Sequence, residues 1–394
     1  MRKISLSVAI AAIVTAGQAF ADGNFGDQLQ SGNKNEADIS QVIESTNNAT
    51  YQWQEGDNNR AYASQVSADS NYIDQTQVGT RNWSETRQYN QEGSEAFTSQ
   101  EGEGNQGIIH QWNGSRNTAY AYQIGSENTM HLDQITGANG NYGDMLQAGS
   151  DNMATLTQEG DGNFFVSTQL GDGHNVWNSS QDGSAEGFHG GQVGDGNVGW
   201  LFQAGQENTA NLIQTGDVHY LDVVQNGTNN VTTLTQEGTG QSSIAFQFGE
   251  DNVISVTQYD IDNIGDIYQV GVGNIATLVQ TGDVNSTEFT QYGDMNTVTI
   301  AQTGSGNLTL GYSEGIANIV DIDQVGELST AVVEQYGLGS SDNIIALSQN
   351  GFDNSAYLAQ SGNDNATYVN QTSAYNMASV HQMGGNNLAT IAQN

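Results

Sequence analysis

The sequence predicts an all-β fold, a parallel β-solenoid with two strands in each coil of about 22 residues and about sixteen coils. A glutamine recurs along the chain of 394 residues, usually at intervals of eleven. An asparagine usually stands six residues before it, and polar and apolar residues alternate between the two. Such a short, fixed period is typical of repeat architectures, in which each unit buries its apolar face against its neighbours.

The recurring glutamines, here called markers, define 33 units from Gln30 to Gln393, with Ser313 in place of glutamine once. The third marker is taken as Gln52. Of the 32 steps between markers, 25 are eleven residues long, and asparagine stands six residues before the marker in 27 of 33 units. The six units without it carry Thr46, Ser94, Glu186, His219, Gln241 and Ser329.

The residues before each marker have the period of a strand. Counting back from Gln280 in steps of two gives Leu278, Ala276 and Asn274, whereas Thr277 lies between them. Alternation with a period of two predicts a strand with one buried face, and an amphipathic helix would place its apolar residues three and four apart. Glycine usually follows the marker by two residues, so we expect about six residues of strand, ending at the marker, and five of turn.

Stacked coils would place each inward amide above its equivalent in the coil below. A buried amide is costly unless it is hydrogen-bonded, and a ladder of identical amides satisfies it. We therefore predict structural ladders of asparagine and glutamine. The candidate site residues are Asn208, Gln214, Asn252, Gln258, Asn274, Gln280, Asn296, Gln302, Asn387 and Gln393.

Composition restricts the class of protein. Residues 1–21 have a charged start, an apolar stretch and a small-x-small end, which predicts a signal peptide and leaves 22–394 as the repeat region. Without residues 1–21 the chain has 5 basic and 44 acidic side chains, so we expect no nucleic-acid partner and no membrane insertion. The chain has no cysteine for disulfides and no proline, which central strands exclude.

The repeat resembles the curlin-repeat family, whose members are subunits of bacterial curli amyloid fibres. The segment from Gln269 to Gln280, "QVGVGNIATLVQ", matches the family motif position by position. The resemblance covers nearly the whole mature chain. It implies a secreted structural subunit of a functional amyloid, located in cell-surface fibres that support adhesion and a biofilm matrix. It also implies a homopolymer that uses a dedicated secretion pore and a nucleator.

Two features differ from the usual family members. The chain has many more repeats, and Asn24, Gly26 and Gln28 are already in register with Gln30, where the family carries a separate targeting segment. We expect end-to-end growth, in which residues 24–30 of an incoming copy add to residues 387–393. This expectation rests on a repeat that continues to both ends of the mature chain, since an uncapped coil exposes a strand edge that templates another chain.

The competing class is a monomeric solenoid that acts as an adhesin, a Ca²⁺-binding roll or an ice binder. Turn aspartates could supply oxygen ligands, and Thr233, Ser255, Thr277 and Thr299 would form a short row. Phe202, Phe246, Tyr268 and Tyr312 would form an aromatic row suited to lateral contacts. No histidine pair has metal-ligand spacing along the chain and no catalytic motif occurs, so we expect no enzyme activity, no metal and no cofactor.

Overall fold

The computed structural model describes residues 23–42, 45–173 and 175–394, and the predicted signal peptide lies outside them. These residues form 33 strands and no helix. No segment of this part of the chain is therefore a helix long and apolar enough to cross a membrane.

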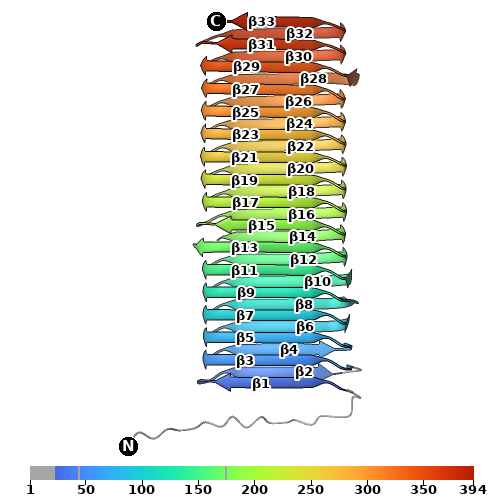
Figure 1. The fold of residues 1–394 in the computed structure, drawn as a ribbon, viewed down its shortest axis with the longest axis vertical. Coiled ribbons are helices and arrows are strands. Elements are labelled where there is room, and N and C mark those ends of the chain that lie inside the picture. The colour runs from blue at the N-terminus through green and yellow to red at the C-terminus, as the bar shows by residue number, and fades with distance from the viewer. Residues whose placement is uncertain (1–22, 43–44, 174) are drawn as a thin grey trace, which may run out of the picture.

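The strands form two parallel sheets, and within each sheet the strands stack along the long axis of the molecule (Figure 1). Odd-numbered strands form sheet A and even-numbered strands form sheet B, so each pair of consecutive strands makes one coil. Sheet A contains β1 (Phe25–Ser31), β3 (Ala49–Asp57), β5 (Tyr72–Thr80), β7 (Glu95–Glu103), β9 (Thr118–Ser126), β11 (Tyr142–Ser150), β13 (Phe164–Asp172), β15 (Gly187–Val193), β17 (Thr209–Asp217), β19 (Val231–Thr239), β21 (Val253–Ile261), β23 (Ile275–Asp283), β25 (Thr297–Ser305), β27 (Ile319–Glu327), β29 (Ile344–Phe352), β31 (Ala366–Thr372) and β33 (Leu388–Gln393). Sheet B contains β2 (Glu36–Val42), β4 (Arg60–Val66), β6 (Trp83–Glu92), β8 (Gln106–Ser115), β10 (Thr129–Asn139), β12 (Met153–Asp161), β14 (Val176–Ser184), β16 (Val198–Gln206), β18 (Tyr220–Thr228), β20 (Ser242–Glu250), β22 (Ile264–Val272), β24 (Ser286–Asp294), β26 (Leu308–Ile316), β28 (Thr330–Ser341), β30 (Ser355–Asn363) and β32 (Met377–Gly385).

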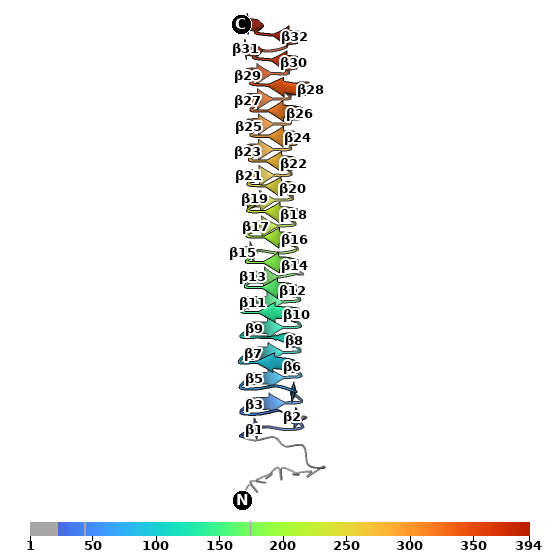
Figure 2. The same ribbon diagram turned by 90° about the vertical axis from the view of Figure 1, so that its right-hand side faces the viewer.

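The core is a thin layer of side chains between the two sheets. Figure 2 shows the two sheets side by side, viewed along the strands. In β23, Ala276 and Leu278 are buried, and they pair in register with Val298 and Ile300 of β25. Most strands repeat this arrangement of small or apolar inward residues before the marker, and a few carry polar ones, such as Ser84 and Thr86 of β6. The predicted all-β parallel solenoid of about sixteen coils is confirmed.

The strands are longer than expected, because most have nine residues and continue three residues past the marker. The prediction that strands end at the marker is therefore wrong. The residues after the marker still pair with the next coil, as Gly304 does with Gly326. Gly304 has a φ of 117°, and a Cβ there would lie 1.9 Å from the carbonyl oxygen of Gly326, so only glycine permits this stacking.

The register corrects the third marker. Gln30 pairs with Gln54, which pairs with Gln77, whereas Gln52 pairs with Gln28. Both Gln52 and Gln54 face inward, since they are two residues apart in one strand. The asparagine six residues before Gln54 is Asn48, and Thr46 lies outside the ladder position.

The longer steps between markers are accommodated outside the core. In β10 the pairing shifts between Ile135 and Asn139, and in β28 it shifts between Tyr336 and Ser341. Gln134 and Gln335 nevertheless remain aligned with the markers of the next coil. Insertions therefore extend the turns and leave the inward register intact.

Candidate functional site: amide ladders, end coils and a histidine cluster

The sheet A markers form one hydrogen-bonded ladder along the described chain. Each glutamine Nε2 donates to the Oε1 of the glutamine one coil further toward the C-terminus. The bond from Gln30 to Gln54 is 2.7 Å long, that from Gln280 to Gln302 is 2.8 Å, and that from Gln371 to Gln393 is 2.8 Å. The donors of the other bonds are Gln54, Gln77, Gln100, Gln123, Gln147, Gln169, Gln192, Gln214, Gln236, Gln258, Gln302, Gln324 and Gln349. All bonds run in one direction, so the ladder is polar.

From Gln54 to Gln393, the second amide proton of each sheet A marker joins the two sheets. Gln280 Nε2 donates to the backbone oxygen of Ile264 on β22 at 2.8 Å, and Gln302 Nε2 donates to that of Ser286 on β24 at 3.0 Å. Both protons of these buried amides are therefore used, which offsets the cost of removing an amide from water. Glutamate could not replace this pattern, because an ionised carboxylate has no donor.

The asparagines form a second ladder, in which the side chain also bonds the backbone of the next coil. Asn274 Oδ1 accepts from both the backbone N and the Nδ2 of Asn296, at 3.0 and 3.1 Å. Asn274 Nδ2 donates to the carbonyl oxygen of Gly293 at 2.6 Å. Each asparagine therefore satisfies turn groups that would otherwise be buried without partners.

All ten predicted site residues lie on the sheet A side. Asn208 and Gln214 belong to the β17 unit, and the other pairs belong to the units of β21, β23, β25 and β33. The Asn208, Asn252 and Asn296 side chains accept from the asparagines one coil further on, and Asn387 donates to Asn365 at 2.8 Å. The structure thus brings five separate asparagine–glutamine pairs onto two continuous ladders.

Glu186 and His219 stand at asparagine positions. The fully buried Glu186 accepts from Asn208 through both carboxylate oxygens, at 3.0 and 3.2 Å. Burial raises the pKa of Glu186 to about 7, although these two hydrogen bonds oppose the shift. The ring of His219 accepts at Nδ1 from the backbone N of Gln241, and burial lowers its pKa. His219 thus takes the place of an asparagine in the stack.

The sheet B ladder repeats the same pattern, with one change. Ser313 Oγ donates to Gln335 Oε1 at 3.0 Å, but within the described residues no bond joins Gln291 to Ser313. The serine hydroxyl is shorter than a glutamine side chain and carries one proton. The two flanking coils still pair in register through β24, β26 and β28.

The end coils of the described chain expose inward faces that are buried elsewhere. In β33, Ala389 and Ile391 are partly exposed, whereas the equivalent Val369 of β31 is buried. Gln382 and Gln393 each have one amide proton without an acceptor in the described chain. At the other end, Gln30 and Gln41 each have a side-chain oxygen without a donor there.

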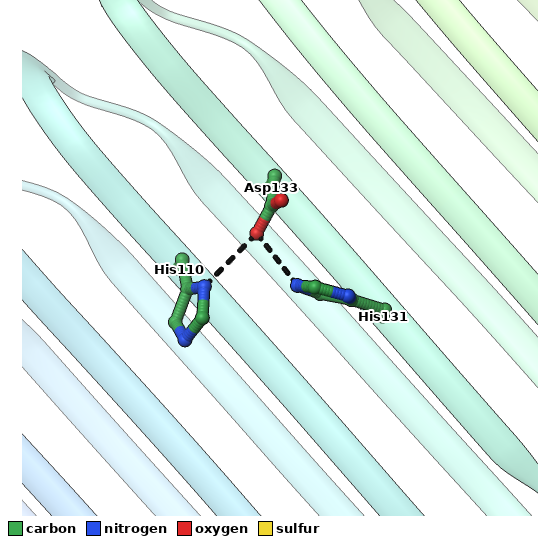
Figure 3. Close-up of side chains that lie close together, drawn as sticks. All are labelled: His110, His131 and Asp133. Atoms are coloured by element: carbon green, nitrogen blue, oxygen red, sulfur yellow. Dashed lines mark ion pairs between the residues drawn. The ribbon is translucent and has the colours of Figure 1, made fainter.

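Stacking also brings His110, His131 and Asp133 together on the outer face of sheet B (Figure 3). His110 Nδ1 lies 3.1 Å and His131 Nε2 lies 2.9 Å from Asp133 Oδ1. No histidine pair has ligand spacing along the chain, and the cluster arises because His110 pairs with Asp133 in the next coil, 23 residues on. A search at coil spacing would have found the cluster.

The two imidazoles and the carboxylate of this cluster shift each other's pKa values. Proximity to Asp133 raises the pKa of His131, although burial opposes this shift. Burial alone would raise the pKa of Asp133, but the two imidazoles outweigh it and lower the pKa to about 2. The Asp133 carboxylate is therefore ionised at neutral pH.

The other surface rows are less regular. Thr233, Ser255, Thr277 and Thr299 do align, as expected. The aromatic row is interrupted, since Val224 lies between Phe202 and Phe246 and Thr290 lies between Tyr268 and Tyr312. A longer row on sheet A was not predicted, with ring centroids 4.7 to 5.9 Å apart. It comprises Phe25, Tyr51, Tyr72, Phe97, Tyr120, Tyr142, Phe164 and His189.

Comparison with known proteins supports the resemblance. The model of the family described as curlin associated repeat matches residues 138–160, 227–259 and 340–372. No curated protein matches the chain. The three matched regions are well separated along the solenoid and lie around β11, around β19 and β20, and around β29 and β30. Curlin repeats and a parallel β-solenoid fit a curli-like structural protein, to which the three matched regions of the chain are similar.

Proposed function

We propose that this protein is a structural subunit of an extracellular amyloid fibre, which it builds by adding copies end to end. The observation that carries the proposal is the polar glutamine ladder, which leaves donors at one end of the described chain and acceptors at the other. A copy stacked head to tail would continue every ladder. Such a contact is strand addition, in which backbone bonds give affinity and aligned side chains give specificity.

The odd number of described strands determines how two copies fit together. The first and last described strands, β1 and β33, both belong to sheet A, which has 17 strands, whereas sheet B has 16. Placing β1 of an incoming copy on β33 would leave one strand missing from sheet B at the junction. Rotating the incoming copy by half a turn about the long axis instead places its β1 on β32 and its β2 on β33. The solenoid then continues without a gap.

This arrangement changes the expected partner of the last strand and keeps the mode of growth. Gln382 would donate to Gln30 of the incoming copy, and Gln393 would donate to its Gln41. Each sheet of the fibre would receive 17 and 16 strands from alternating subunits. The fibre would therefore have a twofold screw relation between neighbouring subunits.

The location, partners and role in the cell extend this proposal. Export to the bacterial surface would remove residues 1–21 and use a dedicated secretion pore, and a nucleator would start the fibre. The assembled fibre would contribute to adhesion and the biofilm matrix. Support for these points comes from the curlin repeat itself.

The outer edge of β33 offers a direct test. The backbone N of Ala366 donates to the backbone oxygen of Asn387 in the next coil. The equivalent N–H of Leu388 therefore points along the solenoid axis toward its open C-terminal end. The N–H of Thr390 does the same, because N–H directions alternate along a strand. Thr390→Pro removes this outward donor, whereas the control Thr390→Ala keeps it.

We expect the Thr390→Pro chain to remain β-rich by circular dichroism but to stop elongation of wild-type fibre seeds, measured by electron microscopy and light scattering. The Thr390→Ala chain should elongate the seeds at close to the wild-type rate. Equal elongation by both variants would show that β33 is not the growing edge. A wild-type chain that stays monomeric without denaturant would instead overturn the fibre proposal and favour the monomeric solenoid.

A further inference from the structure

We propose that His110, His131 and Asp133 form a binding site for a divalent transition-metal ion of the Zn²⁺ class, which links two successive coils. His110 lies on β8, and His131 and Asp133 lie on β10. In the part of the chain that the structure describes, this is the only group of three such side chains with converging ligand atoms. Figure 3 shows both rings directed at the same carboxylate.

The spacing of the three ligand atoms fits a small ion. Zn²⁺ binds histidine nitrogen and carboxylate oxygen at about 2.0–2.2 Å, so tetrahedral ligand atoms lie roughly 3.3 Å apart. The two nitrogens lie 3.1 and 2.9 Å from Asp133 Oδ1, and all three atoms lie within 4.8 Å of one another. The two nitrogen–oxygen separations therefore lie within a few tenths of an ångström of the tetrahedral value.

The contacts inside the cluster leave its polar atoms unsatisfied. His131 Nε2 and Asp133 Oδ1 are shielded from solvent and lie 2.9 Å apart, but their angles do not fit a hydrogen bond. An ion that lies beside both atoms would bind each of them and replace the missing bond.

A carboxylate behind His110 resembles the outer partners of metal-bound histidines. Glu85 Oε1 of β6 lies 3.6 Å from His110 Nε2, the ring nitrogen that does not face Asp133. Arg87 Nε lies 2.6 Å from the same Glu85 oxygen and holds it in place. In metal sites such a carboxylate orients the ring and raises the basicity of the binding nitrogen.

The donor set also selects the ion. Two imidazoles and one carboxylate suit Zn²⁺ or Cu²⁺, whereas Ca²⁺ requires six to eight oxygens, of which this site supplies few. Bound to both coils, the ion would clamp β8 to β10 beside the shifted pairing between Ile135 and Asn139. This site is independent of the fibre proposal, because all three ligands belong to one chain.

The test uses the mature chain without a polyhistidine tag, titrated with Zn²⁺ by calorimetry at constant ionic strength. We expect one Zn²⁺ per chain, and a loss of affinity of at least ~10-fold in His131→Gln and in Asp133→Asn. Glu85→Gln should lower the affinity by roughly 10-fold while keeping the stoichiometry, as expected of an outer partner. His381→Gln is the matched control on sheet B and should bind as the wild type does.

Two further measurements separate a site from charge attraction to an acidic surface. Excess Ca²⁺ should not displace Zn²⁺, and bound Zn²⁺ should slow amide hydrogen exchange in β8 and β10 but not in β32. Far-ultraviolet circular dichroism would verify that each variant folds. Equal Zn²⁺ binding by the wild type and the His131→Gln and Asp133→Asn variants, or displacement by Ca²⁺ at equal ionic strength, would overturn the proposal.

Discussion

Replacing Glu186 by glutamine should make the surrounding coils more stable at neutral and alkaline pH. Glu186 is fully buried in the asparagine ladder, and its pKa is raised from 4.5 to about 7. Gln241 already stands at an equivalent asparagine position, and its Nε2 donates to the backbone oxygens of Glu237 and Asp260. The equivalent backbone oxygens near Glu186 belong to Asp182 and Gly205, and a carboxylate has no proton to offer them.

The magnitude follows from the raised pKa of Glu186. A folded pKa above the unfolded value means that the folded chain binds more protons between the two, so stability falls as pH rises through this window. A pKa difference of one between the folded and unfolded chain corresponds to about 1.4 kcal/mol, so the ionised carboxylate destabilises the local coils by roughly 3 kcal/mol above pH ~7. Below pH ~4.5 this penalty is absent.

Hydrogen exchange with mass spectrometry measures this effect locally, which suits a repeat protein that need not unfold in one step. In the wild type, the opening free energy of peptides from β15 and β17 should fall by about 1.4 kcal/mol per pH unit between pH ~4.5 and ~7. In Glu186→Gln it should stay level across this range. Glu207→Gln removes the same charge from an exposed position and should keep the wild-type slope. Identical pH profiles for the two variants would show that the buried carboxylate of Glu186 does not cause the pH dependence.

Two other perturbations test the ladders and the surface charge. Changing Gln258, Gln280 and Gln302 to glutamate should block ordered assembly, because each site loses its donors at a cost of about 1–3 kcal/mol and carboxylates then stack in successive coils. The matched triple change of outward Thr257, Thr277 and Thr299 to glutamate should slow assembly far less, and equal kinetics would contradict the assigned faces. Added monovalent salt should accelerate assembly, because it screens the exposed charges of a mature chain that carries 44 acidic and 5 basic side chains. Assembly rates, measured by light scattering, that do not change with salt would show that charge repulsion does not limit assembly.

The inward register could be predicted because two independent features of the repeat determine it. Strand alternation fixes which face Leu278 and Gln280 share, and the eleven-residue step fixes which residues stack. Where two glutamines face inward in one strand, alternation cannot choose between them. Gln52 and Gln54 show this, and their pairing with Gln75 and Gln77 in the next coil decides the register.

Other features depend on contacts between coils that no single stretch of sequence contains. The strands extend through Gly304 because its backbone pairs with Gly326, one coil away. His110 and Asp133 are 23 residues apart, and a search for ligands at helical or turn spacing overlooks them. The effect of burial on Glu186 likewise depends on the coils above and below it.

Cryo-electron microscopy of the mature chain, incubated without denaturant, would show whether separate copies continue one solenoid. We expect long fibres with strands every ~4.8 Å along the axis and a half-turn rotation between neighbouring subunits. Single rods of one chain length, or fibres in which the rods associate only side by side, would contradict this expectation.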